Sequence, residues 1–149
     1  MADIEQLVNG LTDQNDKHAY NCLRQLTAIS EQSNEVYRYF DVFAQMLTSA
    51  NSYIRTRGFL LIAANAERDE DCKIDEIIDT CLQCIRDAKP IAARQCIKVL
   101  PHLAKRKPEL KQDIVRALHR ADISIYTGSM QPLVYKNIRE CLAKIAEET

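Results

Sequence analysis

Cys81 and Cys84 are separated by two residues, which is the spacing of half a zinc or iron–sulfur site. Such a site needs further soft ligands, usually a second pair on an adjacent loop, and the sequence has no second pair at this spacing. Cys81 lies four residues after Ile77 and Cys84 lies seven after it, so both fall on or beside the apolar side of a helix. We therefore predict that both thiols pack in the core, and that the chain binds no metal or cofactor.

The other residue types that could do chemistry lack the partners they would need. The three histidines are scattered along the chain and form no ligand motif with a nearby carboxylate. An EF-hand loop over the acidic segment 69–80 would need an oxygen ligand where Lys73 stands and glycine where Ile74 stands. The sequence has no glycine-rich phosphate loop and no serine or cysteine nucleophile in a recognisable turn. It therefore predicts a protein that is not an enzyme.

Positive charge is concentrated in one segment of a chain whose net charge is only −1. Residues 86–120 contain ten lysines and arginines against three acids. Such a local excess can attract an acidic peptide, a nucleic acid or an acidic patch on another protein. Three of the bases, Arg94, Lys98 and Lys105, recur with His102 at intervals of three or four residues. This spacing predicts that they share the polar side of one helix.

The elements that must position these residues are predicted to be helices. The chain has 149 residues, of which 46% are apolar, with three glycines and four prolines, so it is expected to form one domain over residues 1–149. Apolar residues recur at helical spacing, and no segment alternates as a half-buried strand does. Uncharged runs are too short to span a membrane, and no secretory signal opens the chain, so we expect a cytoplasmic protein. The predicted fold class is all-α.

Eight helices are expected, and capping residues and prolines mark most of their starts. The expected starts are, in order, Asp3, Asp13, Ser33, Asn51 or Ser52, a position after Asp71, Pro90, Pro108 and Pro132. The fourth helix is apolar over most of its circumference, so we expect it at the centre of the core with Ile62 fully buried. A single fifth helix is expected to carry the apolar residues from Ile74 to Ile85 on one face. Pro101 is expected to bend the sixth helix without ending it.

The helices repeat in pairs. The segments Ile54–Arg57, Ile91–Arg94 and Leu133–Lys136 align with offsets of 37 and then 42 residues, and in each an aliphatic residue stands three positions before a base. The apolar positions that follow these segments also agree. Two helices in roughly 40 residues are typical of a helical solenoid.

At these residues the chain resembles HEAT-like repeat proteins, over about residues 33–147. The segment Asn51–Gly58 looks like the start of a HEAT second helix, in which a turn leads to an aliphatic–arginine pair and then a small residue. Pro90 and Pro132 stand near the frequent proline of the family. The chain is also similar to small bacterial HEAT-like proteins, some of which carry an iron–sulfur assembly (SufBD) label. The sequence does not support that chemistry, because the proteins that properly bear the name are β-helical and no strand is predicted here. The resemblance implies an α–α superhelix of about four helix pairs, whose second helices line the concave face.

On this resemblance, Arg57, Arg94 and Lys136 would form a ladder of bases on the second helices, next to Lys98 and Lys105. We predict that these five residues bind an acidic protein partner. The family also uses a second-helix arginine to bond acidic side chains and carbonyls between repeats, which would make Arg57 and Arg94 structural. The alternative function is binding of nucleic acid, as in the HEAT-like DNA alkylation repair glycosylases. The chain has no tryptophan and no aromatic cluster among its bases, which counts against that alternative.

Overall fold

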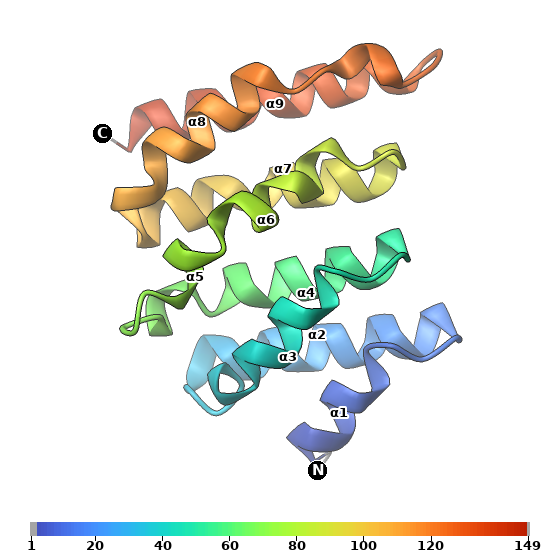
Figure 1. Cartoon of the computed structure of the whole chain (residues 1–149), viewed down its shortest axis with the longest axis vertical. Helices are drawn as coiled ribbons and strands as arrows, with labels where there is room; N and C mark the ends of the chain where they lie inside the picture. The colour runs from blue at the N-terminus through green and yellow to red at the C-terminus, as the bar shows by residue number, and fades with distance from the viewer. Residues whose placement is uncertain (1–2, 149) are drawn as a thin grey trace. The chain divides into compact units, whose positions relative to one another are not determined.

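The computed structural model describes residues 3–148, and over this range the chain folds into helices without any strand. The predicted all-α fold class is therefore confirmed. By its internal contacts the chain divides into two compact units, whose helices are labelled in Figure 1. Unit 1 ends at Asp71 and unit 2 starts at Cys72. Within each unit, a first and a second helix alternate as in a helical solenoid.

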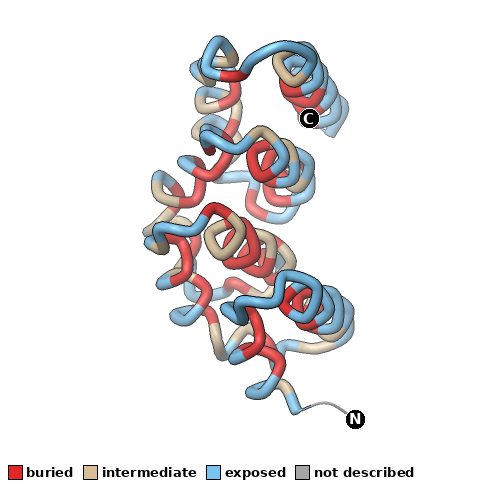
Figure 2. The backbone as a smooth tube through the Cα atoms, turned by 90° about the vertical axis from the view of Figure 1, so that its right-hand side faces the viewer, coloured by how far each residue is buried: buried red, intermediate tan, exposed pale blue. Residues whose placement is uncertain are grey.

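Unit 1 is built from two helix pairs. Its described part contains α1 (Ile4–Gly10), α2 (Asp16–Gln32), the 3₁₀ helix η1 (Tyr37–Tyr39), α3 (Phe40–Met46), α4 (Ser52–Ala64) and the 3₁₀ helix η2 (Ala66–Arg68). Helix α1 packs against α2 and α3 packs against α4, while α2 and α4 also contact each other. In Figure 2, the buried residues of this unit gather on the sides of the helices that face one another. In the two pairs, α1 and α3 are the first helices, and α2 and α4 are the second helices.

Asn51 fixes the start of α4, as the sequence predicts. Its Oδ1 accepts hydrogen bonds from the backbone N–H groups of Tyr53 and Ile54 at 2.8 and 3.2 Å. Further along α4, Phe59 and Ile62 are both fully buried, with 0% of their surface exposed. The prediction that Ile62 lies in the core is confirmed.

Gly58 allows α3 and α4 to approach each other closely. A Cβ atom added at Gly58 would lie 2.8 Å from the carbonyl oxygen of Phe43 and 2.9 Å from Cβ of Met46. Both distances are shorter than a carbon atom can approach without displacing its neighbour. The small residue that the repeat pattern places in α4 therefore serves the packing of the second helix pair.

Unit 2 also contains two helix pairs. Its described part contains α5 (Lys73–Glu76), α6 (Ile78–Leu82), the 3₁₀ helix η3 (Gln83–Arg86), α7 (Pro90–Arg106), η4 (Pro108–Leu110), α8 (Lys111–Arg120), η5 (Ile123–Ile125) and α9 (Met130–Glu147). Helix α7 packs against η3, α8 and α9, and α8 also packs against α9. The two long second helices α7 and α9 therefore lie side by side.

Two prolines lie within α7. Pro90 occupies its first turn, where a missing N–H costs no hydrogen bond. Pro101 lies inside α7 and is buried, and the helix continues past it to Arg106. The prediction that Pro101 does not end the helix is confirmed.

The predicted start of the third helix at Ser33 is wrong. Ser33 instead ends α2, because its backbone N–H donates to the carbonyl of Ile29 at 3.0 Å. Its hydroxyl accepts from the N–H of Glu35 at 3.3 Å, which forms a local turn rather than a helix start. After the 3₁₀ helix η1, α3 begins only at Phe40. Serine occurs both where a helix ends and where the next helix begins, so Ser33 alone does not determine which of the two lies at this position.

The predicted single helix from Ile74 to Ile85 is also wrong, since the segment is divided into α5, α6 and η3. The break lies at Ile77, whose backbone angles of φ −117° and ψ 16° are not helical. Two β-branched residues meet here, at Ile77 and Ile78, and such residues weaken a helix. The apolar side is preserved nevertheless, because Ile74, Ile78 and Ile85 are all buried.

The start of the last helix differs less from the prediction. Helix α9 begins at Met130, two residues before Pro132. Proline is tolerated throughout the first turn of a helix, so it marks the neighbourhood of a start better than the exact residue.

The cysteines pack as the sequence predicts, and this arrangement predicts their reactivity. Five of the six are buried, whereas Cys72 is exposed. Burial raises the pKa of the Cys81 thiol, and it raises the pKa of the Cys141 thiol to about 12. We therefore expect a thiol reagent such as Ellman's reagent to modify one cysteine rapidly in the folded protein, and the other five only after unfolding in guanidinium.

The variant Cys72→Ser should remove the rapid phase and leave the slow thiols unchanged. The double variant Cys81→Ala and Cys84→Ala should leave the metal content unchanged. One zinc or iron ion per chain that disappears in this double variant would overturn the packing account of these two cysteines.

Candidate functional site

Arg57, one of the five predicted site residues, is buried in unit 1, with 7% of its surface exposed. Its Nη1 donates to the backbone carbonyl of Leu11 and its Nη2 donates to the carboxylate of Asp16, each at 2.9 Å. Leu11 is the residue at the end of α1, and Asp16 is the first residue of α2. The guanidinium from α4 thus satisfies a carbonyl at one helix end and a carboxylate at the next helix start.

The other four predicted residues lie in unit 2, and Arg94 connects its two second helices. Nε of Arg94 in α7 donates to Oδ1 of Asn137 in α9 at 2.7 Å. Asn137 is 8% exposed, so this polar contact is largely shielded from water. Sequence reasoning did not single out Asn137, although an asparagine among the regularly spaced apolar residues of a helix indicates a specific hydrogen bond.

Lys98 and Lys105 lie on the exposed side of α7. The exposed positions follow the helical repeat along one stripe, which consists of Ile91, Gln95, Lys98, His102 and Lys105, with Arg106 also exposed at the end of the helix. Leu100 and Leu103 lie off this stripe and are fully buried. Neither lysine has an ion pair within the part of the chain that the structure describes. Their ammonium groups are therefore presented to solvent.

Lys136 lies on α9 beside these residues. Its side chain is 70% exposed, and its Nζ lies 3.9 Å from Oε1 of Glu140, one turn further along. An exposed pair at this distance contributes little to stability. The packing of α7 against α9 thus brings Arg94, Lys98, Lys105 and Lys136 onto two neighbouring helices, with Arg94 in the contact between them.

Lys107 is the base of the 86–120 segment that the structure removes from the surface. Its side chain is only 6% exposed, and its Nζ lies 2.8 Å from Oδ1 of Asp75 and 3.1 Å from Oε2 of Glu109. A hydrogen bond from its own backbone N–H lowers the pKa of the Glu109 carboxyl, and contacts with Lys107 and Asp75 lower it further. The ammonium group is thus held between two carboxylates that connect α5 with η4.

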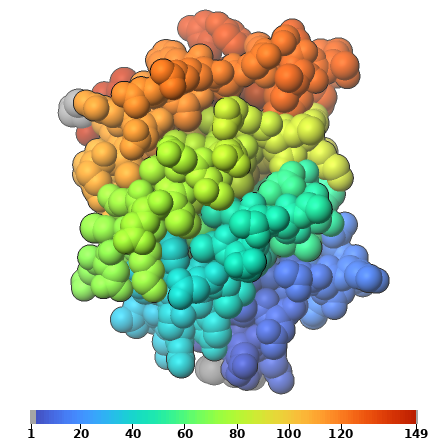
Figure 3. Space-filling model, viewed as in Figure 1, coloured from blue at the N-terminus to red at the C-terminus, as the bar shows by residue number. Residues whose placement is uncertain are grey.

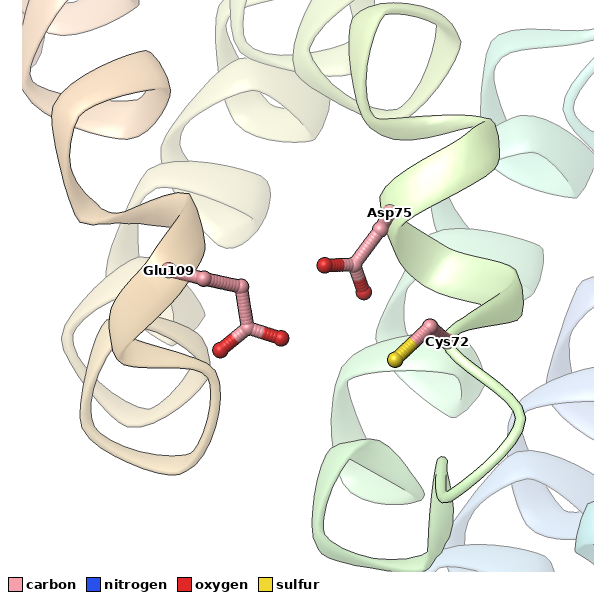
Figure 4. A group of neighbouring side chains, drawn as sticks. All are labelled: Cys72, Asp75 and Glu109. Atoms are coloured by element: carbon pink, nitrogen blue, oxygen red, sulfur yellow. The ribbon is translucent and has the colours of Figure 1, made fainter.

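The same two carboxylates form a possible cation site together with Cys72 (Figure 4). The ligand atoms of Cys72, Asp75 and Glu109 lie within 4.8 Å of one another. However, the Lys107 ammonium already contacts both carboxylates, so a metal ion would have to approach a fixed positive charge or displace it. The geometry therefore favours an ion-pair network over a metal centre.

A groove of about 250 Å³ lies between α6–η3 and α8, on the face of unit 2 that Figure 3 shows. Its lining includes Arg86, Arg116 and Arg120 together with Asp79 and Asp113. Nη1 of Arg116 lies 3.6 Å from Oδ1 of Asp113. The lining charges are therefore mixed in sign.

No helix within residues 3–148 combines the length and the apolar character that a membrane span requires.

Comparison with known proteins gives a match to one family. A family model described as a HEAT repeat domain matches residues 1–142, which is nearly the whole chain. Neither the search of curated proteins nor the search of solved structures found a match. The matched range covers the helix pairs of both units, including Arg57, the Arg94–Asn137 contact and the exposed lysines. The chain therefore belongs to the HEAT repeat domain family.

Proposed function

We propose that this protein is a non-enzymatic interaction module that binds an acidic protein partner through α7 and α9. HEAT repeats commonly serve as protein-interaction scaffolds, and the family is generally non-catalytic. The observation that supports the proposal is the exposed stripe of α7, on which Lys98 and Lys105 carry charges without an ion pair among the described residues. Long-range attraction between opposite charges favours an acidic partner.

The five predicted residues have different roles in this proposal. Lys98, Lys105 and Lys136 are exposed and would contact the partner. Arg94 is half-buried and holds α7 against α9, so it would position the lysines. The guanidinium of Arg57 is used by two contacts inside unit 1, which supports a structural role for it.

Charge reversal tests this proposal. The probe is a fluorescein-labelled polyglutamate peptide, whose binding is followed by fluorescence anisotropy. We expect the double variant Lys98→Glu and Lys105→Glu to weaken binding by more than about tenfold, which corresponds to about 1.4 kcal/mol. The circular dichroism spectrum and the melting temperature should remain nearly unchanged, because both side chains are exposed.

The control is the double variant Lys17→Glu and Arg38→Glu, which makes the same change of net charge at exposed positions of unit 1. It should bind the peptide almost as well as the original protein. Equal losses in both double variants would mean that binding follows net charge alone, and the α7–α9 site would be wrong.

A fluorescein-labelled DNA duplex tests the alternative function in the same assay. If nucleic acid is the partner, the duplex should bind more tightly than the peptide, and its affinity should fall log-linearly with salt between about 50 and 200 mM. A shaped protein interface should be less sensitive to salt. That result with the duplex would overturn the proposal of an acidic protein partner.

A further inference from the structure

Two large apolar side chains are exposed at the N-terminal ends of α7 and α9. Ile91 is 56% exposed and Leu133 is 37% exposed. They occupy equivalent positions of the repeat, 42 residues apart. Singly exposed aliphatic residues are ordinary on a protein surface, so this pair has meaning only through its place beside the lysines of the same two helices.

The hydrogen bond between α7 and α9 relates the positions of Ile91 and Leu133 along the two helices. Arg94 follows Ile91 by three residues and Asn137 follows Leu133 by four, so each apolar residue shares a side of its helix with a member of the bonded pair. The donor and acceptor of that bond are 2.7 Å apart. Ile91 and Leu133 therefore lie at the same end of the α7–α9 contact, each about one helical turn before the bond.

The lysines follow the apolar pair along the same face. Lys98 and Lys105 lie seven and fourteen residues after Ile91, which places them about 10 and 21 Å further along the axis of α7. On α9, Lys136 lies one turn after Leu133. The exposed stripe of α7 is therefore apolar at its N-terminal end and basic beyond it, whereas on α9 Lys136 stands beside Glu140.

We infer that this face binds a segment of another protein in which a large apolar side chain stands next to a run of acidic residues. The inference rests on the proposed function, because it assumes that the lysines contact the partner, and it adds the apolar subsite. The apolar side chain sits on Ile91 and Leu133, which gains free energy from the removal of apolar surface from water. The acidic residues then run along α7 towards Lys98 and Lys105.

Two synthetic peptides test this inference. Both are fluorescein-labelled polyglutamate peptides, and one begins with a pair of leucines where its twin has a pair of alanines. The protein should bind the leucine peptide roughly tenfold more tightly than the alanine peptide. In the double variant Ile91→Ser and Leu133→Ser, the two peptides should bind equally, with the affinity that the alanine peptide has for the original protein.

Two further variants separate this inference from the proposed function. Lys98→Glu with Lys105→Glu should weaken both peptides and keep the preference for leucine. Ile125→Ser removes an exposed isoleucine of the same unit, on η5, and should change neither affinity. Equal binding of the two peptides to the original protein would overturn the apolar subsite while leaving the basic face in place. Loss of the preference in Ile125→Ser would place the subsite elsewhere, and failure of both peptides to bind would overturn the proposed function itself.

Discussion

Replacing Ile62 by alanine is expected to lower the free energy of unfolding by about 2–5 kcal/mol. Ile62 lies in α4 and has no exposed surface, and its neighbours Phe59 and Leu61 are also fully buried. Truncation would remove apolar contacts and leave a cavity that well-packed surroundings cannot fill completely. Urea denaturation followed by circular dichroism measures the loss as a lower midpoint at an unchanged slope.

Val42 provides the matched control. It lies on α3 in the same unit, and it is 43% exposed. Val42→Ala should change the free energy of unfolding by less than about 0.5 kcal/mol, because a surface substitution leaves no cavity. A loss below about 1 kcal/mol for Ile62→Ala would contradict the placement of α4 in the core of unit 1.

The substitution Arg57→Met is expected to lower the free energy of unfolding by about 2–4 kcal/mol. Methionine keeps much of the length of the side chain but donates no hydrogen bond. The carbonyl of Leu11 would then be buried without the partner it has now, and Asp16 would lose its ion pair. Asp16 is 71% exposed, so water would take over that contact, and most of the loss would come from the carbonyl.

Two other variants make this prediction specific. Arg24→Met removes an exposed arginine from α2 and should have almost no effect on unfolding. Arg57→Lys should restore only part of the stability, because one ammonium group does not reproduce two donors in a fixed fork. A change below about 0.5 kcal/mol in Arg57→Met would show that its guanidinium is not structural and would return it to the set of binding residues.

Helix content and capping were readable from the sequence because they depend on neighbouring residues. Asn51 and Pro90 act within one turn of the helices that they start, so their chemistry predicts both boundaries. The predicted boundaries near Ser33 and Ile77 were wrong because the effect of these residues on a helix depends on tertiary packing. Their neighbours in the sequence do not determine that packing. Serine serves a helix end as readily as a helix start, and an isoleucine can close one helix and precede the next when both sides remain apolar.

The candidate site was harder to predict, because burial of a base depends on partners that are distant in the sequence. Arg57 donates to Leu11, which lies 46 residues earlier, and Arg94 donates to Asn137, 43 residues later. Lys107 was counted with the surface charges of its segment, yet Asp75 from another helix holds it in the interior. Helical periodicity correctly predicted that Lys98, His102 and Lys105 share the exposed side of α7, but Arg94, predicted on the same stripe, is half-buried because it bonds Asn137 of α9.

Pro101 interrupts the backbone hydrogen bonds of α7 at one position. Because proline has no N–H, the helical bond to the carbonyl of Ile97 cannot form, and the ladder is interrupted there. Lys98 lies before Pro101 in the chain, and Lys105 lies after it. The ladder of α7 thus lacks one bond between the two lysines, and a bend of the helix at that point would set the angle between the two halves that carry their charges.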